Sequence, residues 1–258
     1  MGYTKNVREI VEQIKMADES QLEELRAEYG SDPRVSVAKA FESADRRIEK
    51  RRAELARVEA MYEPMRAAGE GKVVMGIDEV GRGPIAGPLT VAAVVLPNEP
   101  VVEGVNDSKK LSAKQREEVA DAIRQRALAI GIAHIPPQDI DRDGITASLR
   151  RAMLAAIENA DIEPDLVLID GNPIHVHPRE QCIVKGDSKV ACIAAASIVA
   201  KVTRDRIMVE ADAQYPGYHF ADNKGYGSQQ HIDAIKSLGL TSFHRHTFCT
   251  SFTQATLF

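Results

Sequence analysis

The segment Gly76-Ile77-Asp78-Glu79-Val80-Gly81-Arg82-Gly83 puts two adjacent carboxylates at the end of an apolar, strand-like run. Side chains alternate between the faces of a strand, so Asp78 and Glu79 can meet one ion only where the strand ends or bends, which the glycines permit. Hard divalent cations such as Mg²⁺ take oxygen ligands. Arg82, flanked by glycines, can bring a planar charge close to a phosphate. The alternative is a turn with solvated acids, and the rest of the chain decides between the two.

The bulk composition describes an ordinary globular protein of 258 residues, with 44% hydrophobic residues and a net charge of −5. A net negative charge argues mildly against a general nucleic-acid binder, so any binding of nucleic acid must depend on local basic patches. The three cysteines, Cys182, Cys192 and Cys249, show no CxxC spacing and are typical of reduced thiols. The sequence shows no secretory leader and no apolar run long enough to span a bilayer, so we expect a cytoplasmic protein.

Residues 1–70 favour an all-helical extension. Apolar residues at 7, 10, 11 and 14 share one helical face. Ser20 with Glu23 predicts a capping box for a second helix, and Asp32 followed by Pro33 predicts the start of a long third helix. The basic run RRIEKRR at 46–52 lies on that helix. Such a run is usually a solvated face, and the alternative is a helix that contacts duplex phosphates.

From about residue 71 the pattern changes to alternating strands and helices. We expect strands at 73–78, 89–96, 130–135, 165–170 and 181–184, and helices at 112–128, 146–160, 189–211 and 228–238. Strands joined through a helix imply parallel pairing, whereas the first two strands, joined by the short loop 81–88, imply an antiparallel pair. The prediction is an α/β domain at 71–258 with a mixed central sheet flanked by helices, ending in a helical segment and a tail.

Acids at strand ends indicate the functional edge of this sheet. Asp78 ends the first strand and Asp170 ends a later one, and the carboxyl ends of strands line the crevice of open α/β sheets. Asp187 precedes a helix, where the alternative role is an N-cap. Asp205 is a rival fourth acid, but its neighbours Arg204 and Arg206 favour a structural ion pair. Four carboxylates around two ions roughly 3.5–4 Å apart suit in-line phosphodiester hydrolysis.

Other chemistries lack their motifs. No His or Cys cluster has the spacing of zinc ligands. The sequence contains neither GxxxxGK[ST] nor GxGxxG, which excludes the common nucleoside-triphosphate and dinucleotide sites. It also contains no GxSxG elbow.

Six blocks in order resemble the signatures of the ribonuclease HII family over about residues 72–250: IDEVGRG (77–83), NDSKKLS (106–112), LIDGN (168–172), KGDSK (185–189), AAASIVAKVTRD (194–205) and NKGYGS (223–228). Each block alone would be weak, and their order and spacing make the resemblance specific. It implies a ribonuclease H-like fold and an endonuclease dependent on Mg²⁺ or Mn²⁺, with two ions expected when substrate is bound. The implied substrates are RNA–DNA hybrids and duplex DNA with a single embedded ribonucleotide. The implied cut lies 5′ to the ribonucleotide and leaves a 3′-OH and a 5′-phosphate.

The resemblance also implies roles for individual residues. The catalytic acids and metal ligands are Asp78, Glu79, Asp170 and Asp187. The loop that contacts the 2′-OH and the junction phosphates contains Gly81, Arg82 and Gly83, and Tyr226 lies against the junction; its alternative role is packing in a glycine-rich turn. Ser108 and Lys109 match residues near the backbone phosphates. The 2′-OH lies in the wide, shallow minor groove of an A-like duplex, where a glycine loop and an aromatic ring can approach it.

The two ends of the chain lie outside these blocks. Some bacterial members of the family carry an N-terminal extension, and here its basic run suggests additional contact with the duplex. Gln254, Leu257 and Phe258 resemble a short motif that binds the bacterial sliding clamp, although Ala255 and Thr256 are not its usual central residues. The alternative is a frayed tail or one packed on its own domain. We expect no membrane partner and a monomer.

Two other functions compete with this one. Ribonuclease HIII prefers longer hybrids, carries a β-rich N-terminal domain and lacks the junction tyrosine, whereas here the N-terminus is predicted to be helical and Tyr226 is present. A duplex-binding protein without catalytic activity is the other alternative. The presence of all four acids argues against it.

Overall fold

The computed structural model describes residues 6–253, and the chain divides into two compact units, Met1–Arg57 and Val58–Phe258. The first unit contains α1 (Val7–Met16), α2 (Glu19–Tyr29) and most of α3 (Val35–Arg66). The second contains β1 (Val74–Val80), β2 (Leu89–Val95), η1 (Ser108–Lys110), α4 (Ala113–Arg126), β3 (Ala129–Ile135), α5 (Pro137–Asp143), α6 (Ile145–Asn159), β4 (Leu166–Asp170), β5 (Glu180–Ile183), η2 (Gly186–Ser188), α7 (Ala191–Gln214), α8 (Phe220–Asn223), α9 (Gln229–Leu238), η3 (His246–Phe248) and α10 (Thr250–Thr253). None of the helices formed by residues 6–253 has the length and apolar character needed to cross a bilayer.

The N-terminal unit is helical, as the sequence indicates. Ile10 and Ile14 of α1 pack with Leu22 of α2 and Phe41 of α3 in one small core. These residues recur at helical spacing, so each helix buries one apolar stripe.

The helix starts in this unit differ from the prediction. The capping box of α2 is formed by Asp18 and Gln21, two residues before the predicted pair Ser20 and Glu23. Asp18 accepts from the Gln21 N–H at 2.9 Å and so satisfies one of the orphan donors of the first turn. The prediction for α3 was also wrong, because the Asp32 carboxylate is occupied by the backbone N–H and guanidinium of Arg34, and the helix begins at Val35.

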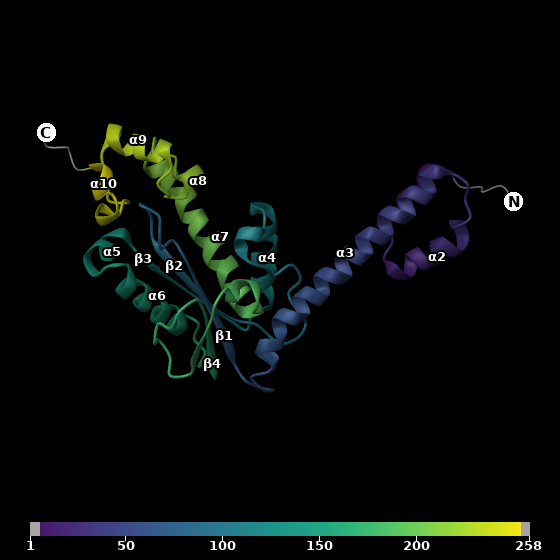
Figure 1. The fold of residues 1–258 in the computed structure, drawn as a ribbon, viewed down its shortest axis with the longest axis horizontal. Coiled ribbons are helices and arrows are strands. Elements are labelled where there is room, and N and C mark those ends of the chain that lie inside the picture. Colours follow the sequence, from purple (N-terminus) through teal and green to yellow (C-terminus); the bar gives the residue numbers. More distant parts are fainter. Residues whose placement is uncertain (1–5, 254–258) are drawn as a thin grey trace. The chain divides into compact units, whose positions relative to one another are not determined.

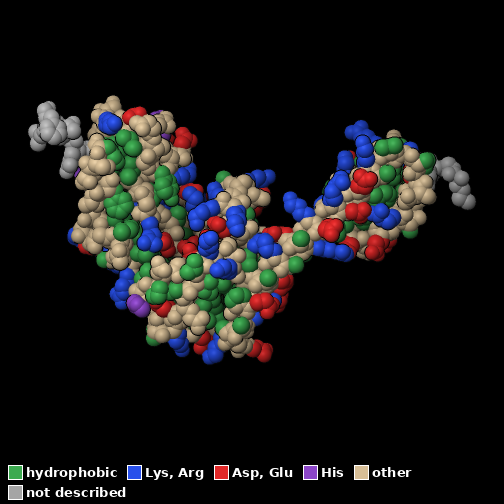
Figure 2. All heavy atoms as spheres, viewed as in Figure 1, with side chains coloured by type: hydrophobic (Ala, Val, Ile, Leu, Met, Phe, Trp, Pro, Cys, Tyr) green, Lys and Arg blue, Asp and Glu red, His purple; other side chains and the backbone are tan. Residues whose placement is uncertain are grey.

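Part of the basic run on α3 serves the unit itself. Arg47 donates to the carbonyls of Lys15 and Ala17 at the end of α1, and Arg52 forms an ion pair with Glu19. Basic and acidic side chains are intermixed on the visible surface of this unit (Figure 2). These contacts agree with the solvated-face interpretation for Arg47 and Arg52. The additional contact with duplex stays a prediction.

The second unit is built on a five-stranded mixed sheet of order β3-β2-β1-β4-β5. The β1–β2 and β2–β3 pairs are antiparallel, and the β1–β4 and β4–β5 pairs are parallel. This confirms the predicted mixed sheet. Figure 1 shows α4 and α7 on one face of the sheet, with α5 and α6 on the other.

Each face of the sheet has its own core, and in each a glycine lets a helix lie directly on a strand. A Cβ at Gly76 of β1 would lie 2.2 Å from the carbonyl carbon of Cys192 in α7. A Cβ at Gly131 of β3 would lie 2.0 Å from the carbonyl oxygen of Ala156 in α6. Only glycine permits such an approach. The position of α7 over β1 is therefore set by backbone contact.

The end of α3 belongs to the core of the second unit. Val58, Tyr62 and Met65 are buried in the cluster that contains α7. The Tyr62 hydroxyl accepts from the backbone N–H of Val102 at 2.9 Å. A boundary drawn from composition after residue 70 therefore separates these side chains from the core that they complete.

A truncation series tests this arrangement. A chain that begins at Val58 should unfold close to the midpoint of the full chain. A chain that begins at residue 71 should lose at least about 3 kcal/mol, because removal of one buried aromatic residue alone costs that much. Urea unfolding followed by circular dichroism measures both. Equal midpoints for the two truncated chains would contradict the assignment of residues 58–66 to this core.

Candidate metal centre and the loops beside it

The alternation of side chains along two parallel strands brings Asp78 and Asp170 together. In β1, Val74 packs on the α7 face and Met75 and Ile77 pack on the α6 face, so Asp78 faces α7. The register pairs Ile77 with Ile169 of β4. The residue after Ile169 is Asp170, which faces the same way because Leu168 packs on the α7 face.

Asp187 comes from the turn that leads into α7. The turn is the short helix η2, entered through Lys185 in the left-handed conformation at φ 56°. The backbone N–H of Gly186 donates to Asp170 Oδ1 at 2.7 Å and ties the turn to the end of β4. The N-cap of α7 is Val190, so the alternative N-cap role for Asp187 is not what the structure shows.

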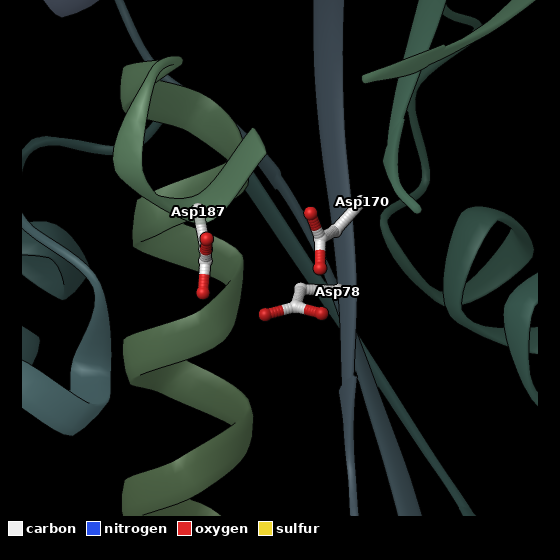
Figure 3. A group of neighbouring side chains, drawn as sticks. All are labelled: Asp78, Asp170 and Asp187. Carbon is white, nitrogen blue, oxygen red and sulfur yellow. The ribbon is translucent and has the colours of Figure 1, made fainter. Parts of the chain in front are cut away.

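These three aspartates form one group. Each offers a carboxylate oxygen, and these oxygens lie within 4.8 Å of one another. Figure 3 shows the Asp78 and Asp170 side chains extending from the neighbouring strands toward Asp187. Among the residues that the structure describes, this is the only group of three or more acidic, His or Cys side chains with such spacing. An all-oxygen donor set fits a hard divalent cation such as Mg²⁺ or Mn²⁺.

Glu79 is not part of this group. It continues β1, which runs on to Val80, so its side chain leaves the opposite face of the strand from Asp78. Its Oε1 accepts from Arg82 Nη1 at 3.3 Å. The sequence predicted four acids at one site, and the structure brings three of them together with Glu79 one residue away along the strand.

Burial and mutual repulsion raise the pKa values of three of these acids. Burial is the main cause of the raised pKa of Asp78, and the charges of Glu79 and Asp170 raise it further. Burial also raises the pKa of Glu79, against the opposing charge of Arg82. The pKa of Asp187 is raised by burial and by Asp107 and Asp170, while Lys109 opposes the shift. Like charges at one buried site resist ionisation together, and a bound cation would relieve that cost.

The loop of residues 81–88, called loop 81–88 below, follows β1 directly. Gly81 adopts φ 94°, and Arg82 extends into solvent with 59% of its side chain exposed. A Cβ at Gly83 would meet no atom within 4 Å. Loop 81–88 therefore presents open backbone and one exposed cationic side chain, Arg82, beside the acids.

Residues 224–227, called loop 224–227 below, are joined to it by hydrogen bonds. Gly225 O accepts from the N–H groups of Ile85 at 2.9 Å and Ala86 at 3.2 Å. Tyr226 lies in this loop and is 48% exposed. The tyrosine and the Gly-Arg-Gly sequence therefore lie on two loops that form one surface.

Two buried histidines hold the backbone of Tyr226. Thr241 N–H donates to His244 Nδ1 at 3.0 Å, so the proton of this ring lies on Nε2, which faces His231 Nε2 at 3.1 Å. His231 must then donate from Nδ1 to Tyr226 O, at 2.8 Å. Burial lowers the pKa of His231 and lowers that of His244 to about 4, so both rings are neutral at pH 7.

Ser108 and Lys109 differ in accessibility. The Lys109 side chain is 79% exposed, and its Nζ lies 3.5 Å from Asp187 Oδ2. Ser108 is 5% exposed, and its hydroxyl lies 3.0 Å from that of Ser197 in α7. Ser197 also hydrogen-bonds Asp78, which opposes the rise in the pKa of that acid. Ser197 lies in the block AAASIVAKVTRD, and the sequence signal for its role is a hydroxyl on an otherwise apolar helix face.

The rival acid Asp205 forms a structural ion pair. Its Oδ1 lies 2.6 Å from Lys201 Nζ, one helical turn earlier on α7. The pairing involves Lys201 rather than Arg204 or Arg206.

Comparison with known proteins places this geometry in a family. The family model described as "Ribonuclease HII" matches residues 75–251, and the model described as "Ribonuclease HII N-terminal domain" matches residues 6–64. The chain belongs to the ribonuclease HII family. It is 42% identical over 249 residues to a ribonuclease HII of Lachnoclostridium phytofermentans, covering 96% of this chain and 98% of that one.

Two solved structures share the fold over about two thirds of this chain. The ribonuclease H2 of Pyrococcus horikoshii superposes with a TM-score of 0.60 at 25% identity, covering 70% of this chain and 99% of that one. The ribonuclease HII of Archaeoglobus fulgidus, solved in a complex with PCNA, superposes with a TM-score of 0.57 at 26% identity and covers 67% and 93%. Membership of the ribonuclease HII family makes this protein a ribonuclease H, an endonuclease that hydrolyses phosphodiester bonds. The ribonuclease HIII alternative lacks support, since residues 6–57 form helices and loops rather than a β-rich domain.

Asp78→Asn should stabilise the metal-free protein while it weakens metal binding. The raised pKa of Asp78 means that the folded state binds a proton more tightly than the unfolded state, so stability falls as the pH rises above 3.8, the ordinary pKa of an aspartate. An amide keeps the oxygen that accepts from Glu79 N–H and removes the charge. We expect a rise of a few degrees in the unfolding midpoint at pH 7.5 without divalent ions, at about 2–4 °C for each kcal/mol.

The matched control is Asp165→Asn, because hydrogen bonds from Val73 N–H and Lys72 lower the pKa of that acid. Loss of the Asp165 charge should lower the unfolding midpoint or leave it unchanged. Mg²⁺ should then raise the midpoint of the wild type more than that of Asp78→Asn. A lower midpoint for metal-free Asp78→Asn would contradict this account of the site.

Proposed function

We propose that this ribonuclease H cleaves the RNA strand of RNA–DNA hybrids and cuts on the 5′ side of single ribonucleotides embedded in duplex DNA, leaving a 3′-OH and a 5′-phosphate. The observation that carries the proposal is the group of three aspartates at the end of β1, from which loop 81–88 continues directly. One edge of the sheet thus holds both a cation site and a surface fit to contact a sugar.

The acids divide the work by their positions. We propose that Asp78, Asp170 and Asp187 hold Mg²⁺ or Mn²⁺, with two ions present when substrate is bound, and that Glu79 contributes from the neighbouring position. When bound by these residues, a divalent cation would activate a water for in-line attack and would stabilise charge on the leaving oxygen. Lys109 offsets the negative charge of Asp187. The hydrogen bonds to Asp170 and Asp78 from Gly186 N–H and Glu79 N–H hold these carboxylates in place before the substrate arrives.

We propose substrate contacts for the side chains and backbone that are exposed beside the acids. Arg82 and Lys109 present charges that suit phosphates, and Gly81 and Gly83 leave backbone uncovered beside them. Tyr226 offers an exposed side chain on the joined loop 224–227, and an aromatic ring can approach a sugar in a shallow minor groove. Because Ser108 is buried against Ser197, we propose that it supports the turn that carries Lys109.

The decisive assay is cleavage of an end-labelled DNA duplex with one ribonucleotide, beside an all-RNA/DNA hybrid, with Mg²⁺ or Mn²⁺. One cut 5′ to the ribonucleotide, lost in Asp78→Asn, is the expected result. Cleavage of the hybrid alone would favour a ribonuclease HIII-like specificity, and binding without cleavage would favour a silent duplex binder.

Gly83→Ala makes this assay specific for the loop. The free protein has open space for the new methyl group and no positive φ at this position, so the unfolding midpoint should not change. If the sugar occupies that space, cleavage at the single ribonucleotide should fall about 100-fold, the scale expected for a misplacement of about 1 Å. Gly81→Ala is the contrasting variant, since its Cβ would meet Arg204 Nε at 2.5 Å and should destabilise the fold itself. Full activity of Gly83→Ala would remove loop 81–88 from the substrate contact.

The clamp motif lies outside the described residues. We propose that Gln254, Leu257 and Phe258 bind the sliding clamp, supported by the resemblance of the motif and by the relative from Archaeoglobus fulgidus, which was solved with PCNA. Deletion of residues 254–258 should abolish clamp binding in a surface plasmon resonance measurement and leave cleavage of free duplex unchanged. Equal clamp binding by both chains would end this proposal.

A further inference from the structure

Two arginines lie completely buried behind the loops that the proposed function assigns to substrate. Arg204 is in the middle of α7, and Arg245 lies between α9 and η3; both are 0% exposed. Among residues 6–253, the salt bridges of the structure include neither of them. An arginine buried without a carboxylate is rare, because its desolvation is costly. Both have the same kind of partner instead: backbone carbonyl oxygens.

Arg245 holds the two ends of the turn in loop 81–88. Its Nη2 donates to Gly81 O at 2.7 Å and to Gly87 O at 2.8 Å. Its Nη1 donates to Arg82 O at 3.1 Å, and its Nε donates to Gly87 O at 3.0 Å. One planar group therefore fixes the backbone on both sides of Gly83.

Arg204 joins this loop to loop 224–227. Its Nε donates to Pro88 O at 2.9 Å and its Nη2 to Ala86 O at 3.1 Å, while its Nη1 donates to Lys224 O at 2.8 Å. Arg204 packs directly against the backbone of loop 81–88, since a Cβ at Gly81 would lie 2.5 Å from Arg204 Nε. The guanidinium of Arg204 thus binds both loops. Its contact in loop 224–227, Lys224 O, lies two residues before the exposed Tyr226.

Only arginine can make these contacts. Its five N–H donors lie in one rigid plane, whereas lysine has a compact ammonium on a flexible chain. Burial lowers the pKa of Arg204 to about 10 and that of Arg245 to about 9, so both remain charged at pH 7. Positive charge behind a loop that faces a phosphate backbone also favours the approach of the substrate.

We propose that Arg204 and Arg245 are positioning residues that hold loop 81–88 and loop 224–227 in the single shape that reads a ribonucleotide. They touch no reacting atom and do not contribute to the acid group. The inference rests on the proposed function, because it assigns the reading of the sugar to these two loops. It adds that the specificity of the enzyme depends on side chains that the substrate never contacts.

The test uses Arg204→Lys and Arg245→Lys in the full chain, since lysine keeps the charge and loses the planar fork. The matched control is Arg206→Lys, the same change two residues along α7 at an exposed arginine that pairs with Glu117. The measurements are kcat and KM for the single-ribonucleotide duplex and for the RNA–DNA hybrid, the unfolding midpoint, and Mn²⁺ binding by electron paramagnetic resonance.

Both buried variants should lower the ratio of kcat/KM for the single ribonucleotide to that for the hybrid by about tenfold, the effect of losing one charge-assisted hydrogen bond. Mn²⁺ binding should stay unchanged, and Arg206→Lys should behave as the wild type. An equal loss on both substrates that follows a lower unfolding midpoint would overturn the proposal in favour of a purely structural role. An unchanged ratio in folded variants would overturn it as well.

Failure of the proposed function has a different signature. If these loops do not read the sugar, then Gly83→Ala and Tyr226→Ala leave the substrate ratio unchanged. If those two variants change the ratio while Arg204→Lys and Arg245→Lys do not, the loops read the substrate without help from the buried arginines.

Discussion

The close contact between α7 and β1 at Gly76 is the constraint on which the site depends. A strand and a helix usually meet through their side chains. Here the absence of one Cβ lets the backbone of Cys192 lie against the strand. The start of α7 is thereby held over the ends of β1 and β4. Asp187, four residues before α7 begins, reaches Asp78 and Asp170, and Ser197 on the helix reaches Asp78. A bulkier residue at 76 would separate the third acid from the other two.

The site is also where the fold gives up stability. Asp78, Glu79 and Asp187 all have raised pKa values because the chain buries them near one another without enough positive charge. Lys109 and Arg82 offset part of this repulsion, but each is largely exposed and therefore screened. A protein selected for stability alone would not keep such a group. A cation site requires carboxylates whose charge is not already neutralised. The electrostatic cost of these acids at the strand ends and their capacity to bind a cation therefore have the same origin.

Much of the catalytic unit could be predicted from local pattern. The strand end at Asp170, the antiparallel hairpin through loop 81–88 and the helix after Asp187 all follow from periodicity and glycine placement. The predicted strand end at Asp78 was wrong, because β1 runs two residues further to Val80. The separation of Glu79 from the other acids also follows from strand alternation, but only once it is known that β1 continues to Val80. The cap at Asp18 and the helix start at Val35 were missed because several neighbouring Asp and Ser residues could serve as caps.

The residues that sequence reasoning missed act through partners far away in the chain. Arg204 and Arg245 bind carbonyl oxygens more than 100 positions earlier, and carbonyls carry no sequence signal. The one local clue was Arg204 on the same face of α7 as Ala200 and Met208, where a charge has no reason to lie unless something buried receives it. Along the chain, Asp78 of the acid group lies just before residue 80, and the loop that the two arginines hold lies just after it. Both groups carry buried charge that the protein alone does not neutralise. They are close in the chain, because Asp78 lies three positions before Gly81, whose carbonyl oxygen accepts from Arg245. Under the proposed function, a cation at the acids and a phosphate backbone at the loops would relieve these two opposite electrostatic costs at adjacent positions.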